Sequence, residues 1–354
     1  MQYRRMGKSG LKVSAICLGT MTYGQQIDED KASELIKSAF DAGVIFFDTS
    51  DAYTDGKSEE ILGKALKGVR HSVVLATKVR GRTGPDVNEI GLSRKHIMKA
   101  VEGSLSRLKT DYIDLYYAHA PDHCTPVEET LRAMDDLVHQ GKVRYIGGSN
   151  YHAWNFCKSL WVSDLHNLAR FECMQPPYNL ITRYIEHELL PLCASEKVGV
   201  CVFNPLAGGL LTGKHDLRKQ PAEGTRFSLG YLVQRGRVPV GSFGRSNQGA
   251  ESTAPPELAG LGEIYYTRYW TEKNFEAVAR LNQIAQENGR SLAQFALAWV
   301  LNNVTITSAI TSATSLKQLE ENVGAAEVNL SPEELAVADE VWYQLRPPFF
   351  DYGR

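Results

Sequence analysis

The chain has 354 residues, of which 43% are hydrophobic and 23% are charged, and its formal net charge is −2. This is an ordinary globular composition, and it contains no basic block of the kind that binds nucleic acid. The polar residues 1–10 precede no apolar run, and no stretch approaches the ~20 apolar residues of a membrane span, so we expect neither a signal peptide nor a transmembrane helix. The six cysteines are scattered without a CxxC pair, which favours a reducing, cytoplasmic setting.

Short apolar runs alternate with longer amphipathic stretches along the chain. The predicted strands are Val13–Gly19, Val44–Asp48, Val73–Lys78, Ile113–His119, Val143–Gly148, Phe171–Gln175, Gly199–Asn204 and Thr305–Thr311. The predicted helices are Glu29–Ala42, Ser58–Lys67, Arg94–Leu108, Pro126–Gln140, Ala153–Asn167, Glu186–Lys197, Thr271–Asn288, Ser291–Leu301, Leu316–Ala325 and Pro332–Leu345. This alternation predicts an α/β fold, a (β/α)8 TIM barrel of parallel strands that forms a single domain over residues 1–354.

Two segments fall outside this alternation. The pattern Gln2–Arg5, Gly7–Gly10 and Lys12 predicts a small N-terminal β-hairpin before the first barrel strand. Residues 215–270 have no clear period and many glycines, so we expect a long irregular insertion after strand seven. Loops of this length are usually functional lids or disordered segments, but a tolerated surface insertion is an equally weighted alternative.

Polar side chains stand where neighbouring strands end, at the face on which barrel enzymes build their sites. Asp48, Lys78 and His119 end the second, third and fourth strands, and Tyr53 lies in the loop after the second. Each has an ordinary structural explanation as a cap, a solvated charge, a hydrogen-bonded imidazole or a packed ring. Their convergence at one face predicts a catalytic site.

These four side chains suit the reduction of a carbonyl group. Tyr53 can donate the proton that the oxygen gains when a hydride adds to the carbon. A free phenol has a pKa of about 10, and we expect Lys78 to lower the pKa of Tyr53. Asp48 would keep Lys78 charged and oriented, and His119 would donate a hydrogen bond to the carbonyl oxygen.

At these residues the sequence resembles the aldo-keto reductase superfamily, most closely its bacterial and potassium-channel β-subunit-like branch. The segments that carry the resemblance are Gly43–Tyr53, Val74–Lys78, Tyr112–His119 and Gly141–Gly147. It runs from Tyr3 to about Trp342, apart from the insertion. The resemblance implies a catalytic tetrad of Asp48, Tyr53, Lys78 and His119, and NAD(P)H bound without a Rossmann fingerprint, consistent with the absence of GxGxxG after a strand.

The resemblance also implies which residues hold the cofactor. The nicotinamide end would contact Gly19, Thr20, Met21, Asp48, Ser149, Asn150 and Gln175, and adenosine would contact Gln318, Glu321 and Asn322. The phosphates are predicted independently at the glycine-containing loop after strand seven, because glycines let backbone N–H groups approach a pyrophosphate. The residues expected there are Phe203, Asn204, Pro205, Leu206, Gly208, Leu210 and Lys214, with Thr311 and Ala313 before the following helix N-terminus. A simple turn is the alternative for the glycines.

The cofactor region departs from the family's pattern. Asn204 stands where relatives often have Ser or Thr before proline, Gly208 stands where they often have Arg, and no basic residue lies near Ser312 or Ser315. Lys214 and Arg226 are therefore the remaining candidates to pair with a 2′-phosphate, which needs clustered cations. We expect NADP(H) in preference to NAD(H).

The substrate site is predicted around Tyr53 and His119. Tyr23 is expected to line it because its loop follows the first strand, with Arg80 and Trp154 as weaker candidates. A metal site at His119, Asp122 and His123 lacks further ligands, so we expect no metal. Two functions remain open: an NAD(P)H-dependent reductase or dehydrogenase acting on a small carbonyl or alcohol, and an NADP(H)-binding regulatory subunit with little turnover. The sequence leaves the substrate and the choice between monomer and homo-oligomer open.

Overall fold

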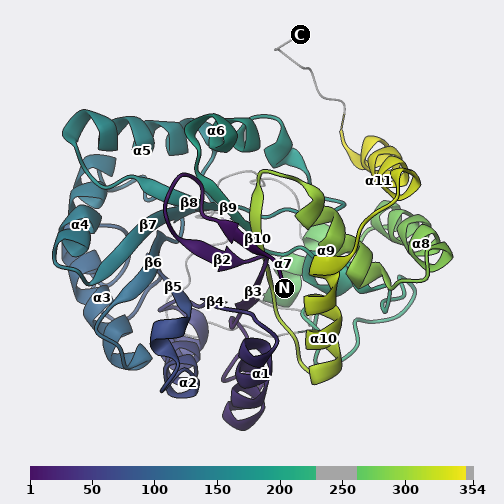
Figure 1. Ribbon diagram of the computed structural model, residues 1–354, viewed down its shortest axis with the longest axis horizontal. Helices are drawn as coiled ribbons and strands as arrows, with labels where there is room; N and C mark the ends of the chain where they lie inside the picture. The colour runs from purple at the N-terminus through teal and green to yellow at the C-terminus, as the bar shows by residue number, and fades with distance from the viewer. Residues whose placement is uncertain (229–260, 348–354) are drawn as a thin grey trace.

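The computed structural model describes residues 1–228 and 261–347. Eight parallel strands close into a barrel in the order β3-β4-β5-β6-β7-β8-β9-β10, with β10 paired back onto β3, and helices surround it (Figure 1). The predicted (β/α)8 barrel is therefore confirmed. Among the described residues, the helices are all too short or too polar to cross a membrane.

The strands and helices follow the predicted alternation, with small shifts at their ends. The barrel strands are β3 (Ile16–Gly19), β4 (Phe46–Asp48), β5 (Val74–Val79), β6 (Ile113–Ala118), β7 (Val143–Ser149), β8 (Phe171–Gln175), β9 (Gly199–Val202) and β10 (Ile306–Thr311). The helices are α1 (Glu29–Asp41), α2 (Lys57–Ala65), α3 (Arg94–Leu108), α4 (Val127–His139), α5 (Ala153–His166), α6 (Leu189–Glu196), α7 (Leu261–Tyr269), α8 (Glu272–Glu287), α9 (Leu292–Asn302), α10 (Leu316–Gly324) and α11 (Pro332–Leu345).

Both faces of the barrel wall are packed, which explains why the strands are continuous apolar runs. A smaller cluster fills the barrel interior and includes Cys17, Phe46, Leu115 and Tyr117. A larger cluster lies between the strands and the surrounding helices. Helices such as α1 and α4 are amphipathic because they bury one face against this wall, and α11 begins with the capping box of Ser331 and Glu334.

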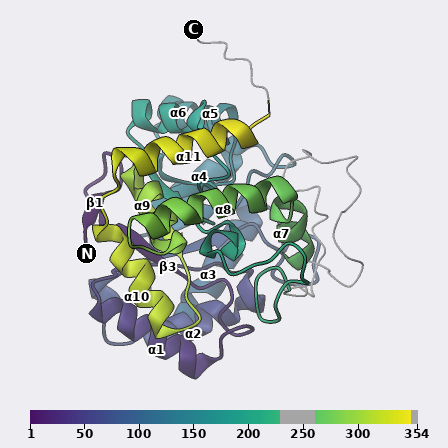
Figure 2. The same cartoon turned by 90° about the vertical axis from the view of Figure 1, so that its right-hand side faces the viewer.

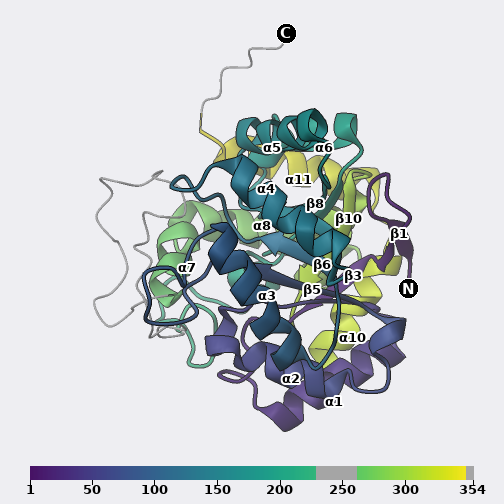
Figure 3. The ribbon, with the colours of Figure 1, turned by 90° about the vertical axis from the view of Figure 1, so that its left-hand side faces the viewer.

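The predicted N-terminal hairpin is present, but it includes residues predicted for the first barrel strand. β1 (Tyr3–Arg5) pairs antiparallel with β2 (Lys12–Ser14), and Tyr3 lies opposite Ser14. The single strand Val13–Gly19 is therefore wrong: the chain turns at Ala15, whose N–H donates to Gln2 O while its carbonyl accepts from Ala309 N in β10. Figures 2 and 3 show the hairpin at the end of the barrel opposite α7.

The segment 215–270 is not irregular throughout, because its last part forms α7. Residues 229–260 of this predicted insertion lie outside the described residues. Helix α7 escaped sequence analysis because its aromatic residues occupy more than one face: Tyr265 stacks with Tyr269, whereas Tyr266 stacks with Trp270. Such a helix has no narrow apolar stripe, so it shows no helical period.

Helices α2 and α3 approach each other closely at Gly63. A Cβ added there would lie 2.5 Å from backbone atoms of Leu108. Gly63→Ala is therefore expected to lower the free energy of unfolding by about 1–3 kcal/mol through overpacking, although alanine is the better helix former. Urea denaturation measures this change.

Gly103 in α3 is the matched control for Gly63. An added Cβ there meets only the guanidinium end of Arg107, a flexible side chain. Gly103→Ala should leave the protein as stable as the unmodified chain or up to about 1 kcal/mol more stable. Equal effects of the two substitutions would contradict the close α2–α3 contact.

Candidate active site

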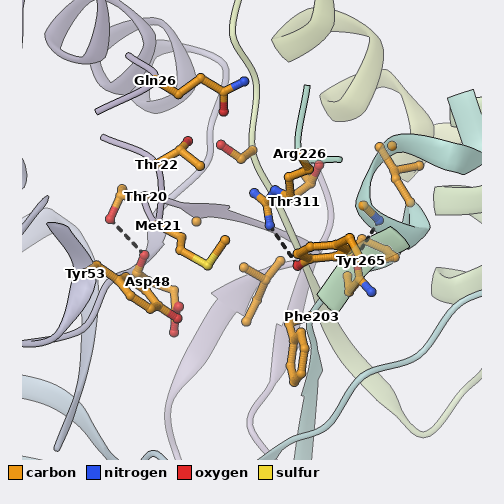
Figure 4. A pocket seen from close by; sticks show the side chains of 18 of the residues that line it. Thr20, Met21, Thr22, Gln26, Asp48, Tyr53, Phe203, Arg226, Tyr265 and Thr311 are labelled. Carbon is orange, nitrogen blue, oxygen red and sulfur yellow. Dashed lines mark hydrogen bonds between the residues drawn. The ribbon is translucent and has the colours of Figure 1, made fainter. Parts of the chain in front are cut away.

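A cavity of about 630 Å³ opens at the carboxyl ends of the barrel strands. Most of the predicted site residues line it together. They are Gly19, Thr20, Met21, Asp48, Tyr53, His119, Ser149, Asn150, Gln175, Phe203, Asn204, Pro205, Leu206, Gly208, Lys214, Arg226, Thr311, Gln318, Glu321 and Asn322. Figure 4 shows Asp48 and Tyr53 on one side of this cavity, and Arg226 with Tyr265 on the other.

Lys78 lies behind the cavity wall and connects the other polar groups of the predicted tetrad. Its ammonium is fully buried, forms an ion pair with Asp48, and donates to Thr49 O at 2.7 Å. It also donates to the Tyr53 hydroxyl at 3.3 Å. The His119 ring packs edge-on against the Tyr53 ring, with centroids 5.7 Å apart. The four side chains, which come from three strand ends and one loop, are therefore neighbours.

An unusual backbone turn brings Tyr53 back over the end of β4. Tyr53 N donates to Ser50 O, and the next two residues, Thr54 and Asp55, have positive φ values of 49° and 53°. Thr54 anchors the turn because its hydroxyl donates to Tyr23 O at 2.8 Å. Strained backbone of this kind is stable only where its surroundings hold it, and it is frequent at functional sites.

The environment of the tetrad determines its protonation states. Burial raises the pKa of Tyr53, and the nearby Lys78 ammonium only partly offsets this effect. Lys78 lowers the pKa of Tyr53 as expected, but desolvation of the phenolate outweighs this attraction, so the pKa is raised overall. Burial alone would lower the pKa of Lys78, but Asp48 and Tyr53 raise it overall. Burial, reinforced by Lys78 and Arg80, holds the pKa of His119 well below its usual range, so the imidazole is neutral at physiological pH.

Amide side chains surround the end of the cavity next to Asp48. Gln175 Nε2 donates to the free oxygen of Asp48 at 2.8 Å, which fixes that amide. Asn150 Nδ2 donates to His119 O at 2.9 Å and to the Ser149 hydroxyl at 3.0 Å. These oriented amides suit the recognition of a flat carboxamide such as that of nicotinamide.

The loop after β9 contains several residues in the left-handed backbone conformation. Asn204, Ala207, Gly208 and Gly209 all have positive φ, and Asn204 Oδ1 accepts from Gly208 N at 2.6 Å. Ala207 N donates to Asn204 O and Gly209 N donates to Leu206 O, so these N–H groups are bonded within the loop. Lys214 and the half-buried Arg226 line the same end of the cavity, and Arg226 donates to the Tyr265 hydroxyl at 3.2 Å. These cations are suited to a dinucleotide's phosphates.

Besides Lys78, three predicted site residues do not line the cavity. Tyr23 is fully buried in the hydrophobic core, so its assignment to the substrate site is wrong. The loop after β3 turns its ring inward, and Thr22 and Gln26 line the cavity instead. The side chains of Leu210 and Ala313 also pack in the core rather than in the cavity. Glycine and proline patterns predict a loop but not which of its side chains turns inward.

Several lining residues were missed by sequence analysis. They include Arg82, Ile264, Tyr265, Arg268, Ala293 and Thr314. Three of them belong to α7, so recognising that helix would have found them. Arg80, a weaker candidate, also lines the cavity, whereas Trp154 lines a second cavity and is 64% exposed. His123 lines the second cavity too, apart from His119, and no cluster among the described residues has the composition of a metal site.

Comparisons with known proteins show the family of the chain. The sequence model of the Aldo/keto reductase family matches residues 15–343. The chain is 38% identical to a protein of Oryza sativa subsp. japonica named probable voltage-gated potassium channel subunit beta, over 94% of each chain. It is 35% identical to an Arabidopsis thaliana protein of the same name, over 93% of this chain and 92% of the relative. It is also 33% identical to versiconal hemiacetal acetate reductase of Aspergillus parasiticus, over 96% of each chain.

Proposed function

Because the chain belongs to the aldo/keto reductase family, we propose that it is a carbonyl reductase that interconverts an aldehyde or ketone and its alcohol with NAD(P)(H). The observation that carries this proposal is the tyrosine–lysine contact at the cavity wall, where the Tyr53 hydroxyl accepts from Lys78 Nζ at 3.3 Å. A phenol held by a buried ammonium is a proton donor and acceptor fixed at one place.

The chain's own residues would carry the proton chemistry. When bound, the nicotinamide supplies or accepts the hydride. Tyr53 donates its proton to the carbonyl oxygen, and Lys78 stabilises the phenolate that this transfer leaves. Asp48 neutralises Lys78 and keeps it in place, while His119 orients the oxygen by a hydrogen bond. Water is excluded from Lys78 because its side chain is fully buried.

A spectroscopic assay tests the proposed activity. The protein is mixed with NADPH and a panel of aldehydes and ketones, and the NADPH absorbance is followed. We expect substrate-dependent decay with at least one carbonyl class. Tight NADPH binding without a fall in NADPH absorbance on any carbonyl would contradict the proposed reductase activity.

We infer a preference for NADP(H) from the cations at the nucleotide end of the cavity. Lys214, Arg226 and Arg268 all line the cavity, and a 2′-phosphate is best held by clustered cations or a bidentate arginine. Arg226→Gln is expected to weaken NADPH binding about tenfold, a loss of ~1.4 kcal/mol, and to change NADH binding little. Fluorescence titration with both cofactors measures the difference.

Arg218 provides the control for Arg226, because it is exposed and does not line the cavity. Arg218→Gln should leave both affinities unchanged. If Arg226→Gln weakened the binding of NADPH and NADH equally, this arginine would instead contact a group that the two cofactors share.

A regulatory role is the second candidate, and the names of the rice and Arabidopsis relatives favour it. In that case the chain would bind NADP(H) and a partner protein with little turnover. The buried Asp48–Lys78 pair beside Tyr53 favours catalysis, since cofactor binding alone does not need it. All six cysteines are free thiols, which supports the proposal of a reducing, cytoplasmic setting.

A further inference from the structure

Ser50 forms a hydrogen-bonded bridge between His119 and a buried carboxyl group. The Ser50 side chain is fully buried, and its Oγ lies 3.3 Å from His119 Nδ1. The same Oγ lies 3.2 Å from Asp51 Oδ1 and accepts from Ala52 N at 3.3 Å. No step described so far uses Ser50 or Asp51.

The bonds available to Ser50 leave only two arrangements of protons. A hydroxyl has one proton to donate and two lone pairs that accept. The Ala52 N–H occupies one lone pair, so one donated and one accepted bond remain for His119 and Asp51. Ser50 therefore donates to one of these groups and accepts from the other.

The two arrangements give His119 opposite properties at the nitrogen that remains for substrate. If Ser50 donates to an ionised Asp51, His119 must donate from Nδ1, and its Nε2 then has no proton. If a neutral Asp51 donates to Ser50, Ser50 donates to Nδ1, and Nε2 carries the proton. Only the second tautomer can donate a hydrogen bond to a carbonyl oxygen.

The surroundings of Asp51 favour its neutral form. Asp51 is 3% exposed, and its Oδ2 has no hydrogen-bond partner. Burial, followed by the nearby Glu59 carboxylate, raises the pKa of Asp51 well above its usual value. Arg107 and hydrogen bonds from Ser50 and Ala52 act in the opposite direction without reversing this rise, and Arg107 is itself engaged by Glu59 at 2.7 Å. A buried, unpaired carboxylate is costly, whereas a carboxylic acid that donates to Ser50 is satisfied.

Other groups around the bridge do not oppose this arrangement. Tyr116 is a neutral phenol, because burial, followed by the effect of Asp51, raises its pKa well above the usual range. Lys78 and Arg80 face His119 and disfavour a positive imidazolium. A neutral imidazole beside a neutral carboxylic acid is therefore the state that fits these charges.

We propose that Asp51, acting through the Ser50 hydroxyl, holds His119 as the tautomer protonated at Nε2, so that the imidazole donates to the carbonyl oxygen. Ser50 and Asp51 are thus positioning residues that act through His119. The value of this tautomer for turnover rests on the proposed reductase function, but the tautomer itself does not. The proposed tautomer and the proposed reductase function can therefore be disproved separately.

Nitrogen-15 NMR of the full chain tests the proposal without any turnover. Histidine is labelled with ¹⁵N, and the His119 signals are identified by their loss in His119→Asn. Protonated and unprotonated ring nitrogens have well-separated shifts, so the tautomer is read directly. We expect a proton at Nε2 and none at Nδ1. A proton at Nδ1 in the unmodified chain would overturn the proposal, whether or not any carbonyl is reduced.

Two variants test the bridge itself. Asp51→Asn replaces the acid with an amide that can donate to Ser50, so we expect the same His119 tautomer. Ser50→Ala removes the bridge, so we expect mixed tautomers and, with a carbonyl substrate, about a tenfold fall in kcat with little change in KM. Ser163→Ala, at a buried serine of α5, should change neither the His119 tautomer nor kcat. Unchanged His119 shifts in Ser50→Ala, or a proton moved to Nδ1 in Asp51→Asn, would contradict the bridge.

Discussion

Tyr53→Phe should lower kcat for aldehyde reduction by a factor of about 10²–10⁴, the usual contribution of a general acid. The ring packs edge-on against His119, and phenylalanine preserves this contact while removing the hydroxyl that meets Lys78. Binding of NADPH should therefore remain nearly unchanged. Steady-state kinetics and a fluorescence titration on the same preparation measure both quantities.

Tyr184 provides a control for the tyrosine substitution because it is 55% exposed and does not line the cavity. Tyr184→Phe should retain full activity. If Tyr53→Phe reduced aldehydes as fast as the unmodified protein, another group would have to supply the proton.

Lys78→Met should abolish most activity and also lower the free energy of unfolding by about 3–5 kcal/mol. Removing one partner of a buried ion pair leaves an uncompensated charge, which is the strongly destabilising case. Asp48 would keep its bond from Gln175 but lose its only cation partner among the described residues. Urea denaturation monitored by circular dichroism gives the stability, and the NADPH assay gives the activity.

Two further variants separate the effects of charge and chemistry at this pair. Asp48→Leu combined with Lys78→Met removes both charges, so it should recover much of the lost stability but none of the activity. Lys142→Met breaks an exposed pair with Glu102 and should cost at most about 1 kcal/mol. A Lys78→Met protein as stable as the Lys142→Met protein would show that the buried pair is not formed.

The barrel could be predicted from sequence because each strand is a continuous apolar run that ends in a turn signal. The hairpin boundary could not, since Ser14 and Ala15 are as compatible with a continued strand as with a corner. Helix α7 was missed because helical periodicity depends on a single buried face. Its tyrosines face both the cavity and Trp270, so burial is divided between two sides.

The candidate site was predicted because parallel strands bring their ends to one face of a barrel. This rule alone places Asp48, Lys78 and His119 together. It does not reveal the direction of a loop side chain, so it could not predict that Tyr23 points into the core. It also gives no measure of desolvation, so the rise in the Tyr53 pKa emerged only when the burial of the ring was known.

We expect this cavity to bring a nicotinamide and a carbonyl together so that Tyr53 can complete a direct reduction. Isotope transfer tests it most directly. The protein is given an active aldehyde with NADPH deuterated on one face of the nicotinamide C4, and in parallel with the opposite isomer. We predict that one isomer gives an alcohol carrying a single deuterium on the former carbonyl carbon and that the other isomer gives none. An alcohol free of deuterium from both isomers, or no alcohol from any aldehyde, would contradict the account.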